Sequence, residues 1–130
     1  MTEKIKPIIY IVDDDEYVRR AIKRLIHSAG FKARSFASGD EFLKARPREE
    51  NACMIVDIKM SGITGLELHE KLIALGSRLP VVYITAFDTE VIRAQARKNG
   101  AVGYFRKPVD DQALLDAIQW ALAGGTDKKA

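Results

Sequence analysis

Several features that mark particular protein classes are scarce in this 130-residue sequence. It has one cysteine, Cys53, so it cannot form an internal disulfide. No apolar run approaches the ~20 residues that span a membrane, and residues 1–7 lack the apolar stretch of a signal peptide. These absences argue against a secreted, disulfide-stabilised or membrane protein, and we expect a cytoplasmic one.

The sequence also has little excess of charge of either sign. The sequence has 21 Lys and Arg against 18 Asp and Glu, a net charge of +3, which does not by itself indicate nucleic-acid binding. The densest basic group lies in the first predicted helix: Arg19, Arg20, Lys23 and Arg24. We interpret such groups as solvated helix faces. Docking of an acidic partner, or direct nucleic-acid binding by this helix, is the alternative.

The sequence does have continuous apolar runs that end on aspartate. Ile8–Val12 leads into Asp13-Asp14-Asp15, and Ala52–Val56 leads into Asp57. Apolar runs of this length, bounded by turn residues, are typical of strands buried on both faces of a parallel sheet. Cys53 lies inside the second run, so we expect it to be a core residue.

Strand and helix patterns alternate five times along the chain. The predicted strands are residues 8–12, 31–36, 52–57, 81–84 and 101–106. This alternation predicts an α/β, doubly wound, flavodoxin-like fold with five helices and a five-stranded parallel sheet in the order 2-1-3-4-5. We expect one domain over residues 8–123, an N-terminal extension over 1–7 and a polar tail over 124–130.

The helix after the fourth strand differs from the others. Asp88 is its predicted N-cap, and its apolar stripe is thin: Val91, Ile92, Ala94 and Ala96. A helix that buries little apolar area is held weakly. If any helix of this protein moves, we expect this one.

Side chains with complementary chemistry follow the predicted strands. They are Asp13 and Asp14, Asp57, Thr85 and Lys107. The carboxyl ends of parallel strands share one edge of a sheet, where ligands bind. Clustered carboxylates repel one another unless a cation offsets their charge, and Mg²⁺ prefers such oxygen ligands. A lysine and a hydroxyl opposite the metal suit phosphoryl oxygens, which predicts phosphoryl transfer with an aspartate as nucleophile.

With these residues in this order, the chain from Ile8 to Leu122 resembles the receiver (CheY-like) domains of two-component response regulators. The matching segments are Asp13-Asp14, Asp57-Ile-Lys-Met with Gly65, Ile84-Thr85-Ala86, and Tyr104-Phe-Arg-Lys-Pro. Each segment alone is weak, but together at these spacings they are highly specific. The stretches starting at Gly100 and Asp110 resemble the FixJ-type branch most.

The resemblance implies roles for the acidic residues. Asp57 would accept a phosphoryl group from a phosphohistidine on a sensor histidine kinase. Asp14, Asp57 and the backbone carbonyl of Lys59 would hold Mg²⁺, with Asp13 assisting through water. The protein would then be a phosphorelay switch, not an enzyme with a diffusible substrate, although it would catalyse its own phosphorylation and dephosphorylation.

The resemblance also implies a switching route and partners. Thr85 and Lys107 would bind phosphoryl oxygens, and Tyr104 would turn inward as Thr85 moves. Homodimers in this family often use the fourth helix, fifth strand and fifth helix. FixJ-type proteins usually carry a DNA-binding domain after the receiver. This sequence reaches only Ala130, so we expect nucleic-acid binding only if such a domain has been cut from a longer regulator.

Two departures from the family pattern lie close to Asp57. Ser61 stands where proline is usual, and we expect it to loosen the loop because proline fixes φ. Lys59 and Phe87 flank the path of an attacking water in the family, and we hypothesise that they set the phosphoryl lifetime. The two histidines, His27 and His69, are predicted to be surface residues.

Two other functions compete with the phosphorylated switch. A Mg²⁺-dependent phosphatase with an aspartyl nucleophile usually has a second aspartate two residues later, where this chain has Lys59. A pseudo-receiver would dock partners without phosphorylation. The complete set of site residues argues against it, although Ser61 leaves it open.

Overall fold

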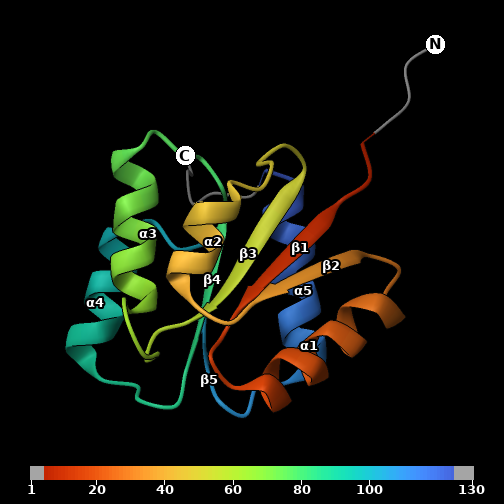
Figure 1. Cartoon of the computed structure of the whole chain (residues 1–130). Helices are drawn as coiled ribbons and strands as arrows, with labels where there is room; N and C mark the ends of the chain where they lie inside the picture. Colours follow the sequence, from red (N-terminus) through yellow and green to blue (C-terminus); the bar gives the residue numbers. More distant parts are fainter. Residues whose placement is uncertain (1–4, 125–130) are drawn as a thin grey trace.

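A computed structural model describes residues 5–124 of the chain and has the predicted architecture (Figure 1). All five strands are parallel and lie in the order β2-β1-β3-β4-β5. They are β1 (Ile8–Val12), β2 (Lys32–Phe36), β3 (Ala52–Asp57), β4 (Val81–Thr85) and β5 (Gly103–Arg106). The helices are α1 (Glu16–Ser28), α2 (Gly39–Ala45), α3 (Gly65–Ala74), α4 (Glu90–Lys98) and α5 (Asp111–Leu122). The predicted fold class and strand order are confirmed.

The sheet separates two hydrophobic clusters, as its alternating side chains require. Tyr10 and Met54 point to one face, which α2, α3 and α4 cover. Ile9 and Cys53 point to the other, which α1 and α5 cover. Strands β1 and β3 lie in the middle of the sheet and are almost fully buried. The prediction that Cys53 is a core residue is therefore confirmed.

Side chains cap every helix at its N-terminus. The side chains of Ser38, Thr64 and Asp110 each accept a backbone N–H, at the start of α2, α3 and α5 respectively. Thr64 and Glu67 form a complete capping box. These caps satisfy N–H groups that have no partner within the helix, so the sequence fixes where each helix begins.

Four predicted boundaries are wrong, those at the start of β2 and the end of β4 by a single residue. The N-cap of α4 is Thr89, whose hydroxyl accepts the Ile92 N–H, because Asp88 is occupied by other partners. Strand β5 begins at Gly103 and not at Ala101. The predicted N-terminal extension falls partly, and the polar tail almost wholly, outside the described residues 5–124.

The prediction that His69 is a surface residue is also wrong, whereas His27 is exposed. His69 is 5% exposed, and its Nδ1 lies 2.6 Å from the Tyr83 hydroxyl. Burial lowers its pKa to about 4, so its ring is neutral at pH 7. Its position in α3 faces β4, and helical periodicity did not reveal a polar partner on that strand.

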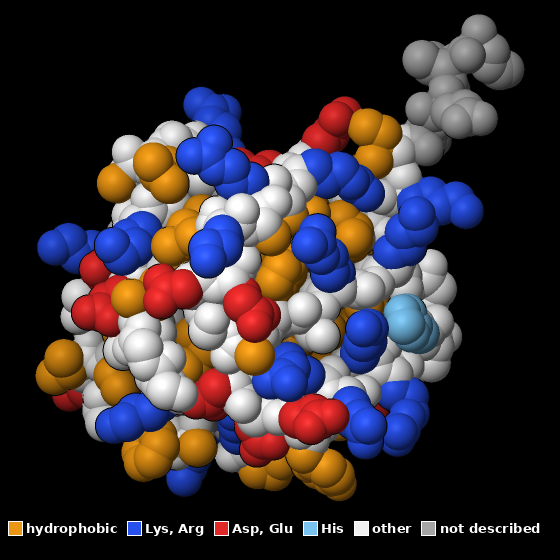
Figure 2. All heavy atoms as spheres, viewed as in Figure 1, with side chains coloured by type: hydrophobic (Ala, Val, Ile, Leu, Met, Phe, Trp, Pro, Cys, Tyr) orange, Lys and Arg blue, Asp and Glu red, His pale blue; other side chains and the backbone are white. Residues whose placement is uncertain are grey.

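The outer surface shows mixed charge. Lys and Arg side chains are spread over the face seen in Figure 2, and acidic side chains lie among them. Within residues 5–124, no helix is long and apolar enough to cross a membrane.

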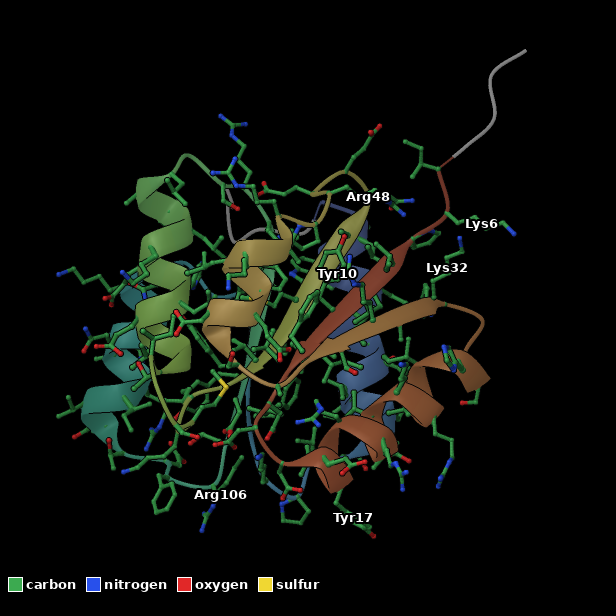
Figure 3. All side chains as sticks on the ribbon, viewed as in Figure 1. Lys6, Tyr10, Tyr17, Lys32, Arg48 and Arg106 are labelled. Carbon is green, nitrogen blue, oxygen red and sulfur yellow. The ribbon has the colours of Figure 1, made fainter. Side chains whose placement is uncertain are left out.

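The two ends of the sheet carry different polar groups. At one end, the buried Tyr10 donates its hydroxyl to the Arg48 carbonyl at 2.6 Å (Figure 3). At the other end, where the strands finish, Tyr17 projects from the start of α1 and is 80% exposed. This second end carries the predicted site.

Candidate functional site

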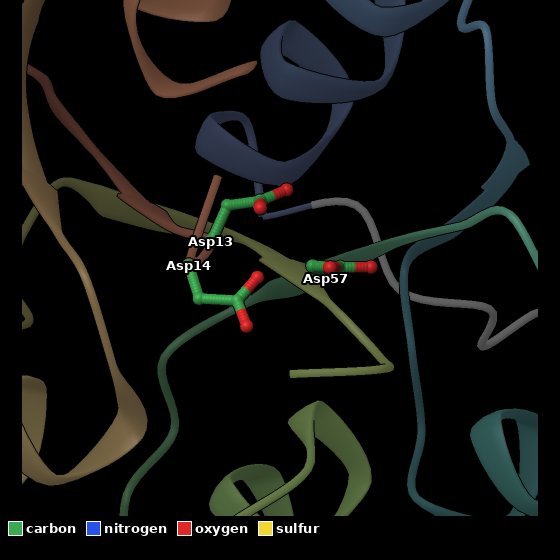
Figure 4. Close-up of side chains that lie close together, drawn as sticks. All are labelled: Asp13, Asp14 and Asp57. Atoms are coloured by element: carbon green, nitrogen blue, oxygen red, sulfur yellow. The ribbon is translucent and has the colours of Figure 1, made fainter. Parts of the chain in front are cut away.

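Three carboxylates meet at the carboxyl edge of the sheet. Asp13 and Asp14 follow β1, and Asp57 is the last residue of β3 (Figure 4). Each offers an oxygen within 4.8 Å of the other two. Asp13 and Asp57 are buried, and Asp14 is exposed. The structure thus brings together three residues that were predicted to converge.

Lys107 joins the two buried carboxylates. Its Nζ lies 3.1 Å from Asp13 Oδ2, to which it donates, and 3.5 Å from Asp57 Oδ2. Burial alone would lower the pKa of Lys107, but the hydrogen bond to Asp13 and the charges of Asp13 and Asp57 raise it. Lys107 is therefore a fixed positive charge beside Asp57, as predicted. The Lys107–Pro108 peptide is cis.

The surroundings of Asp57 disfavour its charged form. Burial, together with the charge of Asp13, raises its pKa to about 6, against the effect of Lys107. One lysine thus does not balance two carboxylates. A divalent cation with oxygen ligands fits this donor set, because it would stabilise the charged form of every member.

Asp14 has a different environment. Its Oδ2 accepts the Ser61 backbone N–H and the Ser61 hydroxyl, each at 2.9 Å. The backbone hydrogen bond is the main reason that its pKa is lowered. Ser61 therefore does not loosen the loop as expected. It ties the loop after β3 to the end of β1, which proline could not do because it has no N–H.

Gly65 allows this loop to pass close to Asp57. A Cβ at position 65 would collide with the Asp57 carbonyl oxygen and would lie 3.0 Å from Ile58 Cα. The Gly65 N–H donates to the Ile58 carbonyl at 2.8 Å. Only glycine allows this approach of backbone to backbone, so Gly65 helps to place α3 beside the site.

Thr85 is the last residue of β4, and its side chain contacts the backbone of the loop that follows this strand. It is fully buried, and its Oγ1 accepts the Phe87 N–H at 2.9 Å. The Phe87 ring is 54% exposed, and Lys59 Nζ lies 4.9 Å from its centroid. This cation–π contact joins the loops after β3 and β4.

Tyr104 is tied to the same region by its hydroxyl, which donates to Asp88 Oδ1 at 3.0 Å. Arg93 Nε contacts the same oxygen at 2.8 Å. Burial, together with the negative Asp88, raises the pKa of Tyr104 to about 12. The half-buried ring thus combines packing with a partnered hydroxyl, and the partner, Asp88, was not predicted.

The comparisons with known proteins agree with this geometry. The model of the family "Response regulator receiver domain" matches residues 9–119. The chain belongs to this family. Receiver domains are signalling switches phosphorylated by sensor histidine kinases, and they bind Mg²⁺ in an acidic pocket; here that pocket corresponds to the cluster of Asp13, Asp14 and Asp57.

Individual relatives of this receiver domain include FixJ-type proteins, as expected. It is 35% identical over 115 residues to the transcriptional regulatory protein TdiR of Thauera aromatica, covering 88% of this chain and 51% of TdiR. It is 33% identical to FixJ of Bradyrhizobium diazoefficiens, covering 88% and 56%. The chain thus spans about half the length of these curated relatives.

Solved structures give the same result. The response regulator StyR matches with a TM-score of 0.86 at 39% identity, over 93% of this chain and 61% of StyR. FixJ-N matches with a TM-score of 0.83 at 29% identity, over 92% and 96%. The receiver fold is therefore shared over almost the whole chain.

Sequence reasoning missed two contacts to the acidic residues. Arg19 donates from Nη1 to the Asp13 carbonyl at 2.7 Å, and Ser61 binds Asp14. The contact of Arg19 had a signal, since it lies one turn after the cap Asp15 and helical side chains lean toward the N-terminus. The Ser61 contact had none, because it joins residues 47 positions apart.

Proposed function

We propose that this receiver domain switches by accepting a phosphoryl group on Asp57 from a phosphohistidine of a sensor histidine kinase. The observation that carries the proposal is the placement of Asp57 beside Lys107, within a cluster of three carboxylates. An Asp57 oxygen forms a bond to phosphorus as the phosphorus–nitrogen bond breaks, and the electron pair of that bond stays on the imidazole. Positioning and charge neutralisation are the main requirements of such a transfer.

Mg²⁺ would be held by Asp14, Asp57 and the Lys59 carbonyl, with Asp13 acting through water, and when bound it neutralises charge on the phosphoryl oxygens. Lys107, whose Nζ lies 3.5 Å from Asp57 Oδ2, would also bind phosphoryl oxygens. Two contacts would keep the end of β1 fixed during transfer. Arg19 donates to the Asp13 carbonyl, and Lys107 donates to the Asp13 carboxylate.

The phosphoryl group would bias two conformations of the loop after β4. Thr85 would give up its contacts with Phe87 to bind a phosphoryl oxygen. As the loop moves, Tyr104 would then break its hydrogen bond to Asp88 and turn inward. The thinly buried helix α4 follows directly, so this movement needs little unpacking of the core.

A homodimer through the face of α4, β5 and α5 is a further part of the proposal. Val91 on α4 is 73% exposed and would supply apolar area to it. DNA binding would require a domain beyond this receiver, and the mixed surface charge does not favour DNA binding by the receiver itself.

The first test is intact mass after incubation with acetyl phosphate and Mg²⁺. We expect a gain of about 80 Da, which is one phosphoryl group, in the wild type and none in Asp57→Asn or in the presence of EDTA. A wild type that binds Mg²⁺ but gains no mass would overturn the proposal in favour of a pseudo-receiver. A continuous release of phosphate from added phosphomonoesters would instead favour a phosphatase.

The contact between Lys59 and Phe87 supports the hypothesis that these residues set the phosphoryl lifetime. Both residues belong to the loops that follow β3 and β4. Removing either side chain would open a path for water to attack phosphorus and release the Asp57 carboxylate. Lys59→Asn and Phe87→Ala phosphoproteins should lose phosphate several-fold faster than the wild type. Lys44→Asn, an exposed change on α2, is the control, and equal decay in all four proteins would end the hypothesis.

A further inference from the structure

Ser61 makes two contacts to the one exposed carboxylate of the acidic cluster. Its backbone N–H and its hydroxyl both donate to Asp14 Oδ2 at 2.9 Å. The two residues lie 47 positions apart and come from the loops after β1 and β3. This contact therefore joins the two loops that carry the acidic cluster.

The three carboxylates of the cluster are held by different partners. Asp13 accepts from Lys107 Nζ and from the Asp15 N–H, and Asp57 lies beside the same Lys107. Among the side chains of residues 5–124, the hydrogen-bond partner of Asp14 is Ser61. An exposed aspartate can otherwise rotate about two side-chain torsions, and the two donors on one oxygen restrict both of them.

The orientation of a carboxylate matters for a cation that must use several ligands at once. Groups that hydrogen-bond to a ligand fix its direction before the metal arrives, and their loss typically weakens metal binding by ~10- to 100-fold. Asp14 is both exposed and repelled by two neighbouring carboxylates. Without the Ser61 donors, this repulsion favours its rotation into solvent, away from the cluster.

We propose that Ser61 is a positioning residue of the Mg²⁺ site: before the cation binds, Ser61 holds the Asp14 carboxylate toward Asp13 and Asp57. This inference rests on the proposed Mg²⁺ site and extends it to a residue that is not itself a ligand. It also assigns a role to the serine that stands where a proline is usual. The hydroxyl and the N–H act together, so that removing one leaves part of the effect.

Calorimetric titration of the wild type and three variants at position 61 with MgCl₂, without any phosphodonor, tests this inference. Ser61→Thr keeps both donors, Ser61→Ala keeps the N–H, and Ser61→Pro keeps neither. We expect the dissociation constant of Ser61→Thr to stay within about twofold of the wild type, that of Ser61→Ala to rise about threefold, and that of Ser61→Pro to rise about tenfold or more.

Ser77→Ala provides the matched control. Ser77 also lies in a loop and accepts the Leu79 N–H with its hydroxyl, but it belongs to the loop before β4, at the end of the sheet away from the site. We expect its Mg²⁺ affinity to equal that of the wild type. Urea unfolding in EDTA shows whether each variant is folded, and if Ser61→Pro is not, the comparison of Thr with Ala decides alone.

Equal affinities in Ser61→Ala, Ser61→Thr and the wild type would overturn the inference. A loss of affinity in Ser61→Thr as large as in Ser61→Ala would also overturn it, because it would show an effect of shape and not of donors. Failure of the proposed function gives a different result. If Mg²⁺ affinity falls in the expected order of variants but Asp57 gains no mass, the Ser61 role stands and the proposed function fails. If Asp57 gains mass but all variants bind Mg²⁺ equally, only the Ser61 role fails.

Discussion

Helices α4 and α5 cover opposite faces of the sheet and are held there in different ways. Helix α5 buries Leu114, Ile118 and Ala121 in the hydrophobic cluster that it shares with α1. Helix α4 buries only Ala96, with Ile92 packed at the edge of the opposite cluster. Burial of aliphatic side chains therefore fixes α5, and α4 needs other contacts.

Polar side chains supply those contacts at both ends of α4. At its start, Asp88 binds Arg93 and the Tyr104 hydroxyl. At its other end, Gln95 and Asn99 donate to Glu70 of α3. Arg93 and Gln95 are exposed and the other four residues are only partly buried, and polar pairs that solvent reaches contribute little to stability.

The comparison shows how the domain can change one side without unfolding the other. A helix with few buried apolar contacts opens locally at a lower free energy than the whole domain. Helix α4 follows Thr85 directly, whereas α5 follows Lys107 and is anchored in the core. The helix with the smaller buried apolar area is thus the one connected to the predicted switch residue.

The largest expected effect comes from removing the anchor of α5. Ile118 is completely buried, so Ile118→Ala should lower the free energy of unfolding by about 4 kcal/mol through lost burial and a residual cavity. Val91→Ala on α4 should change it by less than about 0.5 kcal/mol, because Val91 is 73% exposed. Urea unfolding measures both, and similar losses would show that α4 is as firmly packed as α5.

The next effect is a pH dependence at the junction of α3, β4 and α4. Burial lowers the pKa of His69 to about 4 from its ordinary 6.5, so the unfolded chain binds a proton between these values and the folded chain does not. The stability contribution of the neutral ring is complete above pH 6.5 and is lost as the pH falls toward 4. Between pH 7.5 and 4.5, the wild type should lose about 2 kcal/mol more unfolding free energy than His69→Gln.

Urea unfolding of both proteins at these two pH values provides the measurement. His27→Gln is the control, because His27 is exposed, and it should follow the wild type. Parallel losses in the wild type and His69→Gln would show that His69 takes up its proton without disturbing the Tyr83 contact. Glu70, which faces the same junction, is kept in every variant.

The smallest expected effect on stability comes from Asp88→Ala, which releases Arg93 and the Tyr104 hydroxyl together. Arg93 is exposed and Asp88 and Tyr104 are only partly buried, so the free energy of unfolding in urea should change little. The backbone amides at the start of α4 should nevertheless exchange hydrogen several-fold faster. Gln112→Ala breaks an exposed hydrogen bond to Asp116 on α5 and should leave α4 unchanged; equal exchange in both variants would contradict the role of Asp88.

Much of the fold followed from local sequence patterns. The apolar runs at residues 8–12 and 52–57 predicted the central strands, because only strands buried on both faces are continuously apolar. The spacing of Thr64 and Glu67 in the sequence is typical of a capping box and indicates a helix start, because these side chains act within three positions. The cap of α4 was misplaced, because Asp88 and Thr89 are both good caps and distant Tyr104 occupies Asp88.

The sequence by itself determined that Asp13, Asp14, Asp57, Thr85 and Lys107 lie at one edge, because parallel strands end on the same side of a sheet. Only the tertiary structure decided that Ser61 binds Asp14, that His69 meets Tyr83 and that Tyr104 is tied to Asp88. These contacts join different elements, and their partners depend on loop paths and helix rotation. Local periodicity does not encode either of these.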